Sequence, residues 1–476
     1  MKRESHLPLV FKHYLNGSWT TSATTGMSLN PSDLDEPIGE YARSDARMVD
    51  AAIDSASAAR REWARVGSAR RAESLDAIGT EILARRIELA RLLAREQGKT
   101  LPEAMEETIR AGQVFRFFAV EAVHRTSDCL RAHRGAAAMD VDVSSEPLGV
   151  VAVITPWSFP LAIPAAKIAA ALSAGNCVVF KPAELVAGCA WALADIISRS
   201  GLPAGVFNLL LGSGRVAGAR LVANAGVQGV SFTGSTLTAR SVLQAGAARR
   251  IGVQLETGGN SALIVLNDAN LDKAVDVAVA SAYGMNGQRY AAASKLIVEH
   301  GVRAAFTHAL HSRLERLTVD HALKRGADVG PLFDEGRVQC NLDTVARAEE
   351  RGAQRIHGGR VLERGTRGYF FEPALLLGKA GVPVARDEVF GPIAVVLDAD
   401  DYAHALHLAN ETPDGTSSPC SGLCTASLDI AQHFRRHSHS RAVTVNLPTT
   451  VAADPPSVDF ARDNFFTQPR IVYLAA

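Results

Sequence analysis

Gly149-Val-Val-Ala-Val-Ile154 leads into Thr155-Pro-Trp-Ser-Phe-Pro160, then an alanine-rich stretch to Ser173, and then Cys177-Val-Val-Phe180. The two valine-rich runs are apolar throughout, which is typical of strands that are buried on both faces. The alanine-rich stretch between them has the length and composition of a helix. A strand, a helix and a second strand in this order predict a parallel sheet covered by helices.

The same alternation continues along the chain. Further short apolar runs, each bounded by glycine, proline or a polar turn, lie at 205–211, 229–232 and 251–255. A second series follows Glu256, with apolar runs or helical patterns at 262–265, 271–282, 296–298, 302–317, 330–332, 368–373 and 390–396. We therefore predict two packed α/β domains with a boundary at Glu256.

The N-terminal part has a different pattern. Residues 8–45 read as short strands and turns, and Tyr14-Leu-Asn-Gly-Ser-Trp19 alternates around one such turn. From 45 to about 123, apolar residues recur every three or four positions, which predicts helices. Gly98-Lys-Thr-Leu-Pro102 is expected to end one helix and begin the next.

Composition limits the class of protein. The 476 residues predict two or three domains. Lys+Arg and Asp+Glu both number 50, which argues against nucleic acid or an anionic membrane as a partner. The six cysteines show neither a paired framework nor the spacing of a zinc site, so we expect reduced thiols, a cytoplasmic protein and no metal. We find no apolar run long enough for a signal peptide or a membrane span.

Three turns at strand ends could bind a nucleotide. Gly212-Ser-Gly214 and Phe232-Thr233-Gly234-Ser235 each connect a strand to a helix, and Lys181 with Glu184 follows a third strand. Each feature alone is equally well explained as an ordinary turn, a helix cap or a surface residue. Together they lie at the carboxyl edge of one sheet, where dinucleotides bind.

A series of motifs along the chain resembles the aldehyde dehydrogenase superfamily. The motifs are Pro156-Trp157-x-Phe159-Pro160, Lys181-Pro-Ala-Glu184, Phe232-Thr-Gly-Ser235, Glu256-x-Gly-Gly259, Gly287-Gln288 and Glu388-x-Phe-Gly-Pro392. They occur in the order of the family, and the likeness runs from about Tyr14 to Thr449. The resemblance implies an α/β fold with two Rossmann-type parallel-sheet domains and a small β oligomerisation element.

The resemblance also implies which parts of the chain form each domain. Residues 1–126 and 148–256 correspond to the NAD(P)-binding domain, 257–444 to the catalytic domain, and 127–147 with 445–476 to the oligomerisation element. It implies a small-molecule substrate, an aldehyde above all, and a homodimer or homotetramer. The cofactor-binding positions implied are Ile154, Thr155, Pro156, Trp157, Lys181, Glu184, Gly214, Thr233, Gly234, Ser235, Glu388 and Phe390.

Within that set the resemblance assigns individual roles. Lys181 and Glu184 hold the adenosine ribose, Ser235 holds the pyrophosphate, and Glu388 holds the nicotinamide ribose. The cofactor is NAD or NADP. Glu184 favours NAD, because a carboxylate at this place repels a 2′-phosphate.

The expected catalytic residues are Glu256, Tyr290 and Ser158, and two of them depart from the family pattern. Glu256 matches the general base of the family. Tyr290 stands where the family has its nucleophilic cysteine, and a phenol with a pKa near ~10 is a poor substitute for a thiolate. Ser158 replaces the asparagine that donates to the oxyanion, a loss that typically costs ~10²–10³ in rate. Asn260 replaces a lysine, and the chain after Thr449 lacks the usual glycine-rich segment.

The sequence leaves three interpretations open. The first is an oxidoreductase that works without a covalent intermediate, with Tyr290 as hydrogen-bond donor or acid and Glu256 as base. The second is a catalytically inactive protein that keeps its nucleotide pocket for binding or assembly, in which Tyr290 fills the vacated cavity. The third is ordinary aldehyde oxidation with an unrecognised nucleophile, for example a cysteine that is distant in sequence and folds into the site. We favour the first, because the expected base and cofactor-binding residues match the family.

Overall fold

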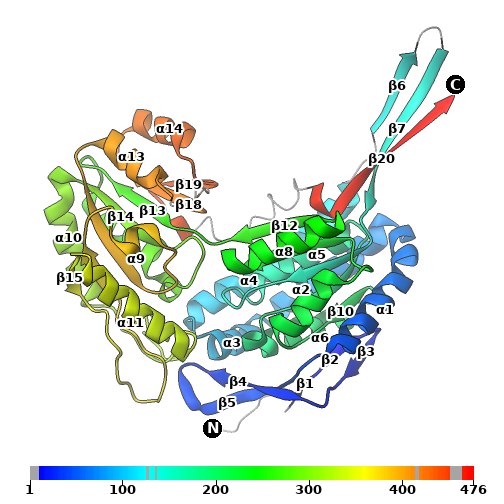
Figure 1. Ribbon diagram of the computed structural model, residues 1–476, viewed down its shortest axis with the longest axis horizontal. Coiled ribbons are helices and arrows are strands. Elements are labelled where there is room, and N and C mark those ends of the chain that lie inside the picture. The colour runs from blue at the N-terminus through cyan, green and yellow to red at the C-terminus, as the bar shows by residue number, and fades with distance from the viewer. Residues whose placement is uncertain (1–9, 125–127, 135–136, 413–417, 451–463, 476) are drawn as a thin grey trace.

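The computed structural model describes residues 10–124, 128–134, 137–412, 418–450 and 464–475, and both predicted parallel sheets are present (Figure 1). The first sheet has seven strands in the order β12-β11-β8-β9-β10-β2-β3, and neighbours from β12 to β10 run parallel. Its strands are β2 (His13–Leu15), β3 (Ser18–Thr20), β8 (Val150–Ile154), β9 (Cys177–Lys181), β10 (Phe207–Leu209), β11 (Gly229–Gly234) and β12 (Gly252–Thr257).

The centre of the first sheet is apolar because its strands are covered on both faces. Every residue of β8 and β9 is buried, as the valine-rich runs predict. All twelve residues of α5 (Ala162–Ser173) are buried as well, and α1 (Ala46–Arg65) also packs against β9. Small alanine side chains let α5 approach the sheet closely. The remaining helices of this part are α2 (Ser68–Ala84), α3 (Arg86–Gln97), α4 (Leu101–His124), η1 (Glu184–Val186), α6 (Ala187–Ser198), η2 (Gly214–Gly218), α7 (Ala219–Ala223) and α8 (Thr236–Arg249).

The expected helix boundary at 98–102 is confirmed. Helix α3 ends at Gln97, and Gly98 follows it in the left-handed conformation with φ 91°. Helix α4 begins at Leu101, with Pro102 in its first turn. Glycine tolerates positive φ and proline needs no amide partner in a first turn, which explains both positions.

The turn expected within 14–19 is also present. Asn16 and Gly17 both have positive φ, 48° and 78°, between the antiparallel strands β2 and β3. Two successive residues of this kind form the tight hairpin turn that suits twisted strands. The hairpin adds β2 and β3 to the edge of the first sheet.

His13 on β2 is a buried titratable group. Its Nδ1 accepts a hydrogen bond from the Leu211 amide at 3.1 Å, which requires a ring nitrogen without a proton. Burial lowers the pKa of His13 to about 4, although Asp45 acts in the opposite direction. Because the folded-state pKa lies below the unfolded value of about 6.5, the stability that depends on neutral His13 is complete above pH 6.5 and declines toward pH 4.

We expect the free energy of unfolding to fall by about 2 kcal/mol between pH 7 and pH 5 on account of His13 alone. The variant His13→Asn presents an oxygen to the Leu211 amide and cannot titrate, so it should lack this part of the loss. Urea unfolding of both proteins at pH 7 and pH 5 measures the difference. Equal pH dependence in the two proteins would show that His13 does not control it.

The second sheet also has seven strands, in the order β15-β16-β17-β14-β13-β18-β19. All neighbours run parallel except β15 and β16. Its strands are β13 (Ser261–Val265), β14 (Ala293–Glu299), β15 (Gln354–His357), β16 (Ala374–Leu377), β17 (Ile393–Ala399), β18 (Cys420–Cys424) and β19 (Ala442–Val445). The helices of this part are α9 (Leu271–Ala282), η3 (Gly284–Gly287), α10 (His300–Leu314), α11 (Glu335–Glu350), α12 (Pro383–Arg386), α13 (Tyr402–Asn410) and α14 (Leu428–His437).

Two runs expected to continue the second sheet are not strands. Residues 330–332 form no strand or bridge, and the isolated bridge Val319↔Val329 lies just before them; residues 368–373 contribute only the isolated bridge Val361↔Phe371. The Leu332 amide donates to the Tyr369 carbonyl, and the Tyr369 amide donates to the Pro31 carbonyl. Their backbone groups therefore bind each other and the N-terminal segment instead of a sheet neighbour.

Two smaller sheets complete the fold. Near the N-terminus lie β1 (Val10–Phe11), β4 (Thr25–Asn30) and β5 (Asp33–Ala42). The other sheet projects from the first domain and carries the C-terminus (Figure 1); it consists of β6 (Asp128–Arg134), β7 (Ala137–Pro147) and β20 (Thr467–Ala475), with η5 (Asn464–Phe466) before β20. Ile471, Tyr473 and Leu474 on β20 are exposed, so this sheet presents apolar side chains to solvent.

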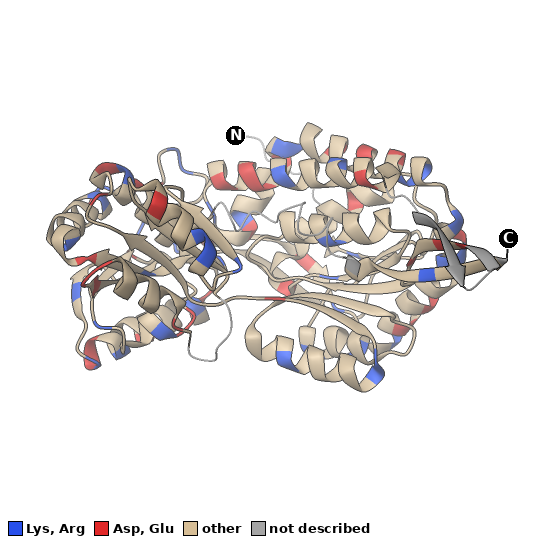
Figure 2. Cartoon of the chain, turned by 90° about the horizontal axis from the view of Figure 1, so that it is seen from above, with Lys and Arg blue, Asp and Glu red and all other residues tan. Residues whose placement is uncertain are grey.

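Charges of both signs are interspersed over the helices (Figure 2). Within the described ranges, we find no helix that is both long and apolar enough to cross a membrane.

Candidate active site

The predicted site residues gather where the two sheets face each other. In the first sheet, the register pairs Ile154 with Lys181 and with Phe232, and Thr233 with Glu256. These residues therefore lie together at the carboxyl ends of β8, β9, β11 and β12. From Glu256 the chain passes through 257–260 directly into β13, so the amino-terminal edge of the second sheet begins beside them.

Glu256 is bound by two side chains of the first domain. Its Oε2 accepts a hydrogen bond from Thr233 Oγ1 at 2.7 Å and lies 3.3 Å from Lys167 Nζ. Lys167 is fully buried on α5 and also donates to Ser231 Oγ at 2.9 Å. The side chain of Glu256 is 23% exposed. The carboxylate is therefore held in place and still open to solvent.

The surroundings of Glu256 keep it ionised. Burial by itself would raise the pKa of this carboxyl, but the charges of Lys167 and Arg441 and the Thr233 hydrogen bond outweigh it. The pKa consequently lies below its ordinary value. Glu256 is thus a carboxylate at neutral pH, and a weaker base than an isolated glutamate.

The loop before Tyr290 has an unusual backbone. Met285 and Asn286 have φ values of 50° and 59° and Gly287 has 62°, so three successive residues are left-handed. Non-glycine residues in this region cost about 1–3 kcal/mol each. A Cβ on Gly287 would lie 2.1 Å from the Gly391 carbonyl oxygen, so only glycine fits there.

Contacts from outside the loop hold this backbone. Asn286 Nδ2 donates to the Gly330 carbonyl at 3.0 Å, and Gln288 Oε1 accepts from the Phe333 amide at 3.0 Å. The matching motif Gly287-Gln288 therefore has a structural role in shaping the loop that carries Tyr290.

Tyr290 packs in a small apolar cluster at the base of the site. The cluster consists of Phe159, Ile163, Met285, Ala291 and Cys420, with Tyr290 and Ala442 partly buried against it. The fold thus places Cys420 in the cluster against which Tyr290 packs, although the two residues are far apart in sequence. Burial raises the pKa of Cys420 to about 12. A thiol in that state is a poor nucleophile, which weighs against aldehyde oxidation by this cysteine.

Ser158 lies on a loop that a buried ion pair supports. Lys99 Nζ donates to the Ser158 carbonyl at 3.0 Å, forms an ion pair with Glu107 and lies 4.6 Å from the centroid of the Phe159 ring. Glu107 Oε1 also accepts from the amides of Leu161 and Ala162, at the start of α5. The pair fixes the loop between β8 and α5, on which Ser158 sits.

Two of the residues expected to bind the cofactor have unused polar atoms. Glu184 Oε2 and Thr155 Oγ1 are buried and have no hydrogen-bond partner in the described part of the chain. Buried polar atoms of this kind are costly unless a ligand satisfies them. Lys181 Nζ donates to the Pro182 carbonyl at 2.8 Å, and burial lowers the pKa of Lys181 to about 8 in spite of Glu184. These atoms fit a ribose diol, which offers hydroxyl donors and acceptors.

Glycine and a capped helix shape the neighbouring turns. A Cβ on Gly214 would lie 3.8 Å from Lys181 Nζ, so the backbone of η2 passes close to that lysine. Ser235 caps α8 and accepts from the Thr238 amide. A helix N-terminus with free amides is a favourable place for a phosphate.

The expected nicotinamide side is formed by both domains. The Trp157 ring stacks on Phe333 with centroids 4.1 Å apart and meets the Phe390 ring edge-on at 5.5 Å. A Cβ on Gly258 would lie 1.6 Å from Glu388 Oε1, so the Glu388 side chain lies against the backbone after Glu256. Partial desolvation raises the pKa of Glu388, and Arg337 acts in the opposite direction.

Several of these residues escape sequence analysis. Lys99, Glu107 and Arg441 carry no local signal, because their partners lie far away in the chain. Lys167 does stand out, as the one charge in the alanine-rich helix. A lone lysine in a helix that is buried against a sheet predicts a buried polar or acidic partner for its ammonium group.

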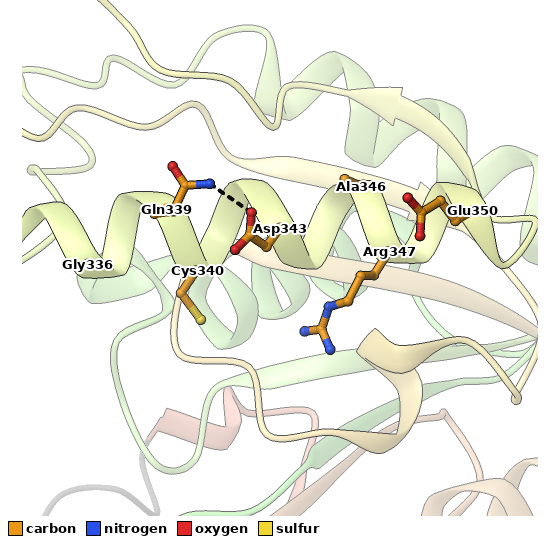
Figure 3. Close-up of a pocket in the computed structure, with 7 residues that line it drawn as sticks. All are labelled: Gly336, Gln339, Cys340, Asp343, Ala346, Arg347 and Glu350. Carbon is orange, nitrogen blue, oxygen red and sulfur yellow. Dashed lines mark hydrogen bonds between the residues drawn. The ribbon is translucent and has the colours of Figure 1, made fainter.

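A shallow pocket of about 610 Å³ lies elsewhere, along α11 (Figure 3). One face of that helix lines it, with Gln339 Nε2 donating to Asp343 Oδ1 at 2.7 Å. It contains none of the predicted site residues, and we assign it no function. Among the residues that the structure describes, no three His, Cys, Asp or Glu side chains gather as a metal site would require.

The sequence model of the aldehyde dehydrogenase family matches residues 19–458. The chain belongs to this family. It is 35% identical to alpha-ketoglutaric semialdehyde dehydrogenase of Bacillus subtilis (strain 168) over 414 residues, 86% of this chain and 84% of the relative. It is 37% identical to the NADP(+) succinate-semialdehyde dehydrogenase of Escherichia coli (strain K12) over 408 residues, 85% and 83% of the two chains.

A solved aldehyde dehydrogenase has the same fold. The structure of betaine aldehyde dehydrogenase from Staphylococcus aureus in complex with NAD+ matches with a TM-score of 0.92 and 25% identity, covering 98% of this chain and 95% of that one. The predicted aldehyde dehydrogenase fold is therefore confirmed. Family membership identifies an aldehyde oxidoreductase fold that uses NAD or NADP, in agreement with the unsatisfied Glu184 and Thr155 atoms.

Proposed function

We propose that the protein is an NAD(P)-dependent oxidoreductase that acts on an aldehyde or a related carbonyl compound without a cysteine nucleophile. The observation that carries this proposal is the state of Glu256. The carboxylate is ionised, partly exposed and fixed by Lys167 and Thr233 beside the expected cofactor residues. A carboxylate of this kind can accept a proton from water or substrate.

In the proposed mechanism, Glu256 accepts a proton from a water molecule as the water oxygen bonds to the carbonyl carbon. The Tyr290 hydroxyl donates a hydrogen bond to the carbonyl oxygen, with Ser158 as a second candidate donor. When bound, NAD(P) supplies the acceptor for the hydride that leaves the hydrated carbonyl. In sum, one aldehyde and one water give one carboxylic acid, one hydride equivalent for NAD(P) and one proton.

The alternative is a catalytically inactive member of the family that keeps nucleotide binding or serves in assembly. The observation that favours it is the packing of Tyr290 against a cluster of five buried residues, which a cavity-filling side chain would also adopt. Glu256 argues against this alternative. A protein in which Tyr290 only fills a cavity does not require a partly exposed carboxylate with an ion pair.

Two measurements separate these proposals. Calorimetric titration with NAD and NADP tests the nucleotide pocket, and absorbance at the nicotinamide band with a panel of aldehydes tests turnover. We expect both binding and turnover. Binding with no turnover across the panel favours the inactive protein, and no binding of either nucleotide contradicts both proposals.

Within this function we propose NAD as the preferred cofactor, because the Glu184 carboxylate repels a 2′-phosphate. The relatives named above act on semialdehydes, and we propose an aldehyde of that kind as substrate. The domain division at 127–147, 257 and 445, a homodimer or homotetramer, and a cytoplasmic location remain predictions. The exposed apolar residues of β20 are compatible with a subunit interface.

We expect Glu184→Ala to weaken NAD binding by about 10- to 100-fold, because a buried carboxylate that accepts from the ribose is lost. NADP binding should fall less or improve, since the repulsion of a 2′-phosphate is removed as well. Calorimetry with both nucleotides measures the change. Glu62→Ala, an exposed glutamate on α1, is the control, and an unchanged NAD affinity in Glu184→Ala would remove Glu184 from the site.

A further inference from the structure

Asn260 is a buried polar side chain between the two sheets that the proposed mechanism does not use. It follows Glu256 in the segment that joins β12 to β13, and it is only 5% exposed. Its Nδ2 donates to the Asp387 carbonyl at 2.7 Å and to the Val384 carbonyl at 3.1 Å. Its Oδ1 accepts from Ser294 Oγ at 3.2 Å. The Asn260 amide therefore joins the segment after Glu256 to α12 and to β14.

The orientation of this amide is fixed by its partners. An asparagine side chain has two N–H donors and one carbonyl acceptor, and here two carbonyls and one hydroxyl match them. In the reversed orientation, the Asn260 oxygen would face two carbonyl oxygens, which cannot donate. The backbone is held as well, because Ser418 Oγ donates to the Asn260 carbonyl at 2.9 Å. Asn260 therefore cannot turn without leaving buried polar atoms unsatisfied.

The two carbonyls that Asn260 binds belong to the segment that carries Glu388. Val384 lies in α12, and Asp387 is the residue at which this helix ends. Glu388 comes next, and a Cβ on Gly258 would overlap its Oε1. Among the residues that the structure describes, we find no hydrogen bond or ion pair of the Glu388 carboxylate. The place of this carboxylate is therefore set by its backbone, which Asn260 holds at Asp387.

A second asparagine holds the other side of Glu388 less completely. Asn341 Nδ2 on α11 donates to the Phe390 carbonyl at 3.3 Å. Its Oδ1 is buried and has no hydrogen-bond partner within the described ranges. The Asn260 contact at Asp387 is shorter, and the Asn260 amide has a partner for each of its polar atoms.

Asn260 is also linked to the two residues expected to act on the carbonyl. Glu256 precedes it in the same segment, and its hydroxyl donor Ser294 lies at the start of β14, shortly after Tyr290. The side chain that holds the backbone before Glu388 is thus bound to both of these segments. A shift of Glu388 relative to Glu256 and Tyr290 requires that bonds of Asn260 break.

We propose that Asn260 is a positioning residue for the nicotinamide end of the cofactor, because it holds Glu388 where that carboxylate meets the nicotinamide ribose beside Glu256 and Tyr290. The inference rests on the proposed function, which supplies the cofactor and the role of Glu388. A carboxylate can accept from both hydroxyls of a ribose when its place is fixed to within about 0.5 Å. Without the bonds of Asn260, the cofactor would have to order this segment itself, which lowers its affinity.

The test separates the two ends of the cofactor. Calorimetric titration of the full-length protein compares NAD with ADP, which lacks the nicotinamide ribose. Asn260→Leu removes the amide and keeps a side chain of similar size. Ser294→Ala is a milder change, because it removes only the donor to Asn260 Oδ1. Glu388→Ala, alone and combined with Asn260→Leu, shows whether Asn260 acts through Glu388.

Asn176→Leu is the matched control. Asn176 is buried, its Nδ2 also donates to two carbonyls, and its Oδ1 accepts from the Gly149 amide at 2.9 Å. It directly precedes β9, so it lies at the amino-terminal edge of the first sheet, away from the expected cofactor residues. The control therefore loses the same kinds of hydrogen bond elsewhere, and thermal unfolding confirms that each variant is folded.

We expect Asn260→Leu to weaken NAD binding by about tenfold and to leave ADP binding unchanged. The loss of NAD affinity should be smaller in Ser294→Ala and absent in Asn176→Leu. Glu388→Ala should also weaken NAD binding, and the double variant should bind NAD as tightly as Glu388→Ala alone. A general loss of stability does not produce this non-additivity, whereas a residue that acts through Glu388 does.

Several results would overturn the proposal. They are an unchanged NAD affinity in Asn260→Leu, equal losses for NAD and ADP, additive losses in the double variant, and a loss in Asn176→Leu as large as that in Asn260→Leu. A native protein that binds NAD no more tightly than ADP also overturns it. If Asn260→Leu does not fold, Ser294→Ala carries the test, and an unchanged NAD affinity in that variant overturns the proposal.

Failure of this inference differs from failure of the proposed function. Turnover of an aldehyde, together with an NAD affinity that does not depend on Asn260, removes Asn260 alone. An NAD affinity that depends on Asn260 through Glu388, together with no turnover of any aldehyde, keeps the positioning role and refutes the oxidoreductase.

Discussion

Tyr290→Cys should gain aldehyde oxidation, measured as reduction of NAD with a short aldehyde. The loop before residue 290 is held by hydrogen bonds to Gly330 and Phe333, and the side chain of residue 290 makes neither of them. A thiol at this place can attack the carbonyl and form the covalent intermediate that a phenol does not. Because Ser158 is a weaker oxyanion donor than an amide, Tyr290→Cys with Ser158→Asn should exceed the single variant by about 10²–10³-fold.

The control for this gain is Tyr290→Ala, which removes the ring without supplying a thiol. Both substitutions open space beside Phe159 and Met285, so thermal unfolding of each variant should be measured to confirm that it is folded. If Tyr290→Cys is no faster than Tyr290→Ala, the rest of the site is not arranged for thiol chemistry. The proposal that residue 290 lies at the nucleophile position would then be wrong.

Glu256→Gln should reduce turnover of the native protein by about 10²–10⁴-fold, the usual contribution of a positioned general base. The amide can still accept from Thr233, so the loss reports the missing proton acceptor. The Glu256 pKa lies below its ordinary value of 4.5. The pH at which the native protein loses half of its rate on the acid side should therefore be lower than 4.5. Steady-state rates between pH 4 and pH 9 measure both effects.

A matched substitution on a strand of the second sheet controls for the change of charge. Glu299 is the last residue of β14, where it accepts from the Asn267 amide, and Glu299→Gln should leave turnover unchanged. Glu256→Gln also leaves buried Lys167 without its carboxylate, which costs stability, so NAD binding should confirm the fold. Turnover in Glu256→Gln equal to that of the native protein would exclude Glu256 as the base.

Strands covered on both faces were the part of the fold most open to prediction. Burial of every position in β8, β9 and β13 leaves an uninterrupted apolar run, which is visible without knowledge of the partners. Strand β18 is equally buried, but small and polar residues in Cys420-Ser-Gly-Leu-Cys424 interrupt the apolar run, so the sequence does not predict a strand there. Residues 368–373 are apolar for a different reason, since they pack beside the N-terminal segment at Pro31.

The candidate site likewise contains some residues that can be predicted from sequence and others that cannot. Glycines such as Gly258 and Gly287 can be placed from sequence because the backbone leaves no room for a side chain. The ion pairs of Lys99 and Lys167 cannot, since their partners follow from tertiary packing. Arg441 has no motif at all, and its proximity to Glu256 depends on how β18 and β19 pair.

The left-handed turn at Met285, Asn286 and Gly287 bears on how this protein could have diverged from its relatives. Codons for cysteine and tyrosine differ by one base, and the turn is fixed by atoms outside residue 290. On the proposal that residue 290 stands at the nucleophile position, one mutational step exchanges the side chain without rebuilding the hydrogen bonds that shape the loop before it. The reverse step is equally short, because those hydrogen bonds are the same in both directions.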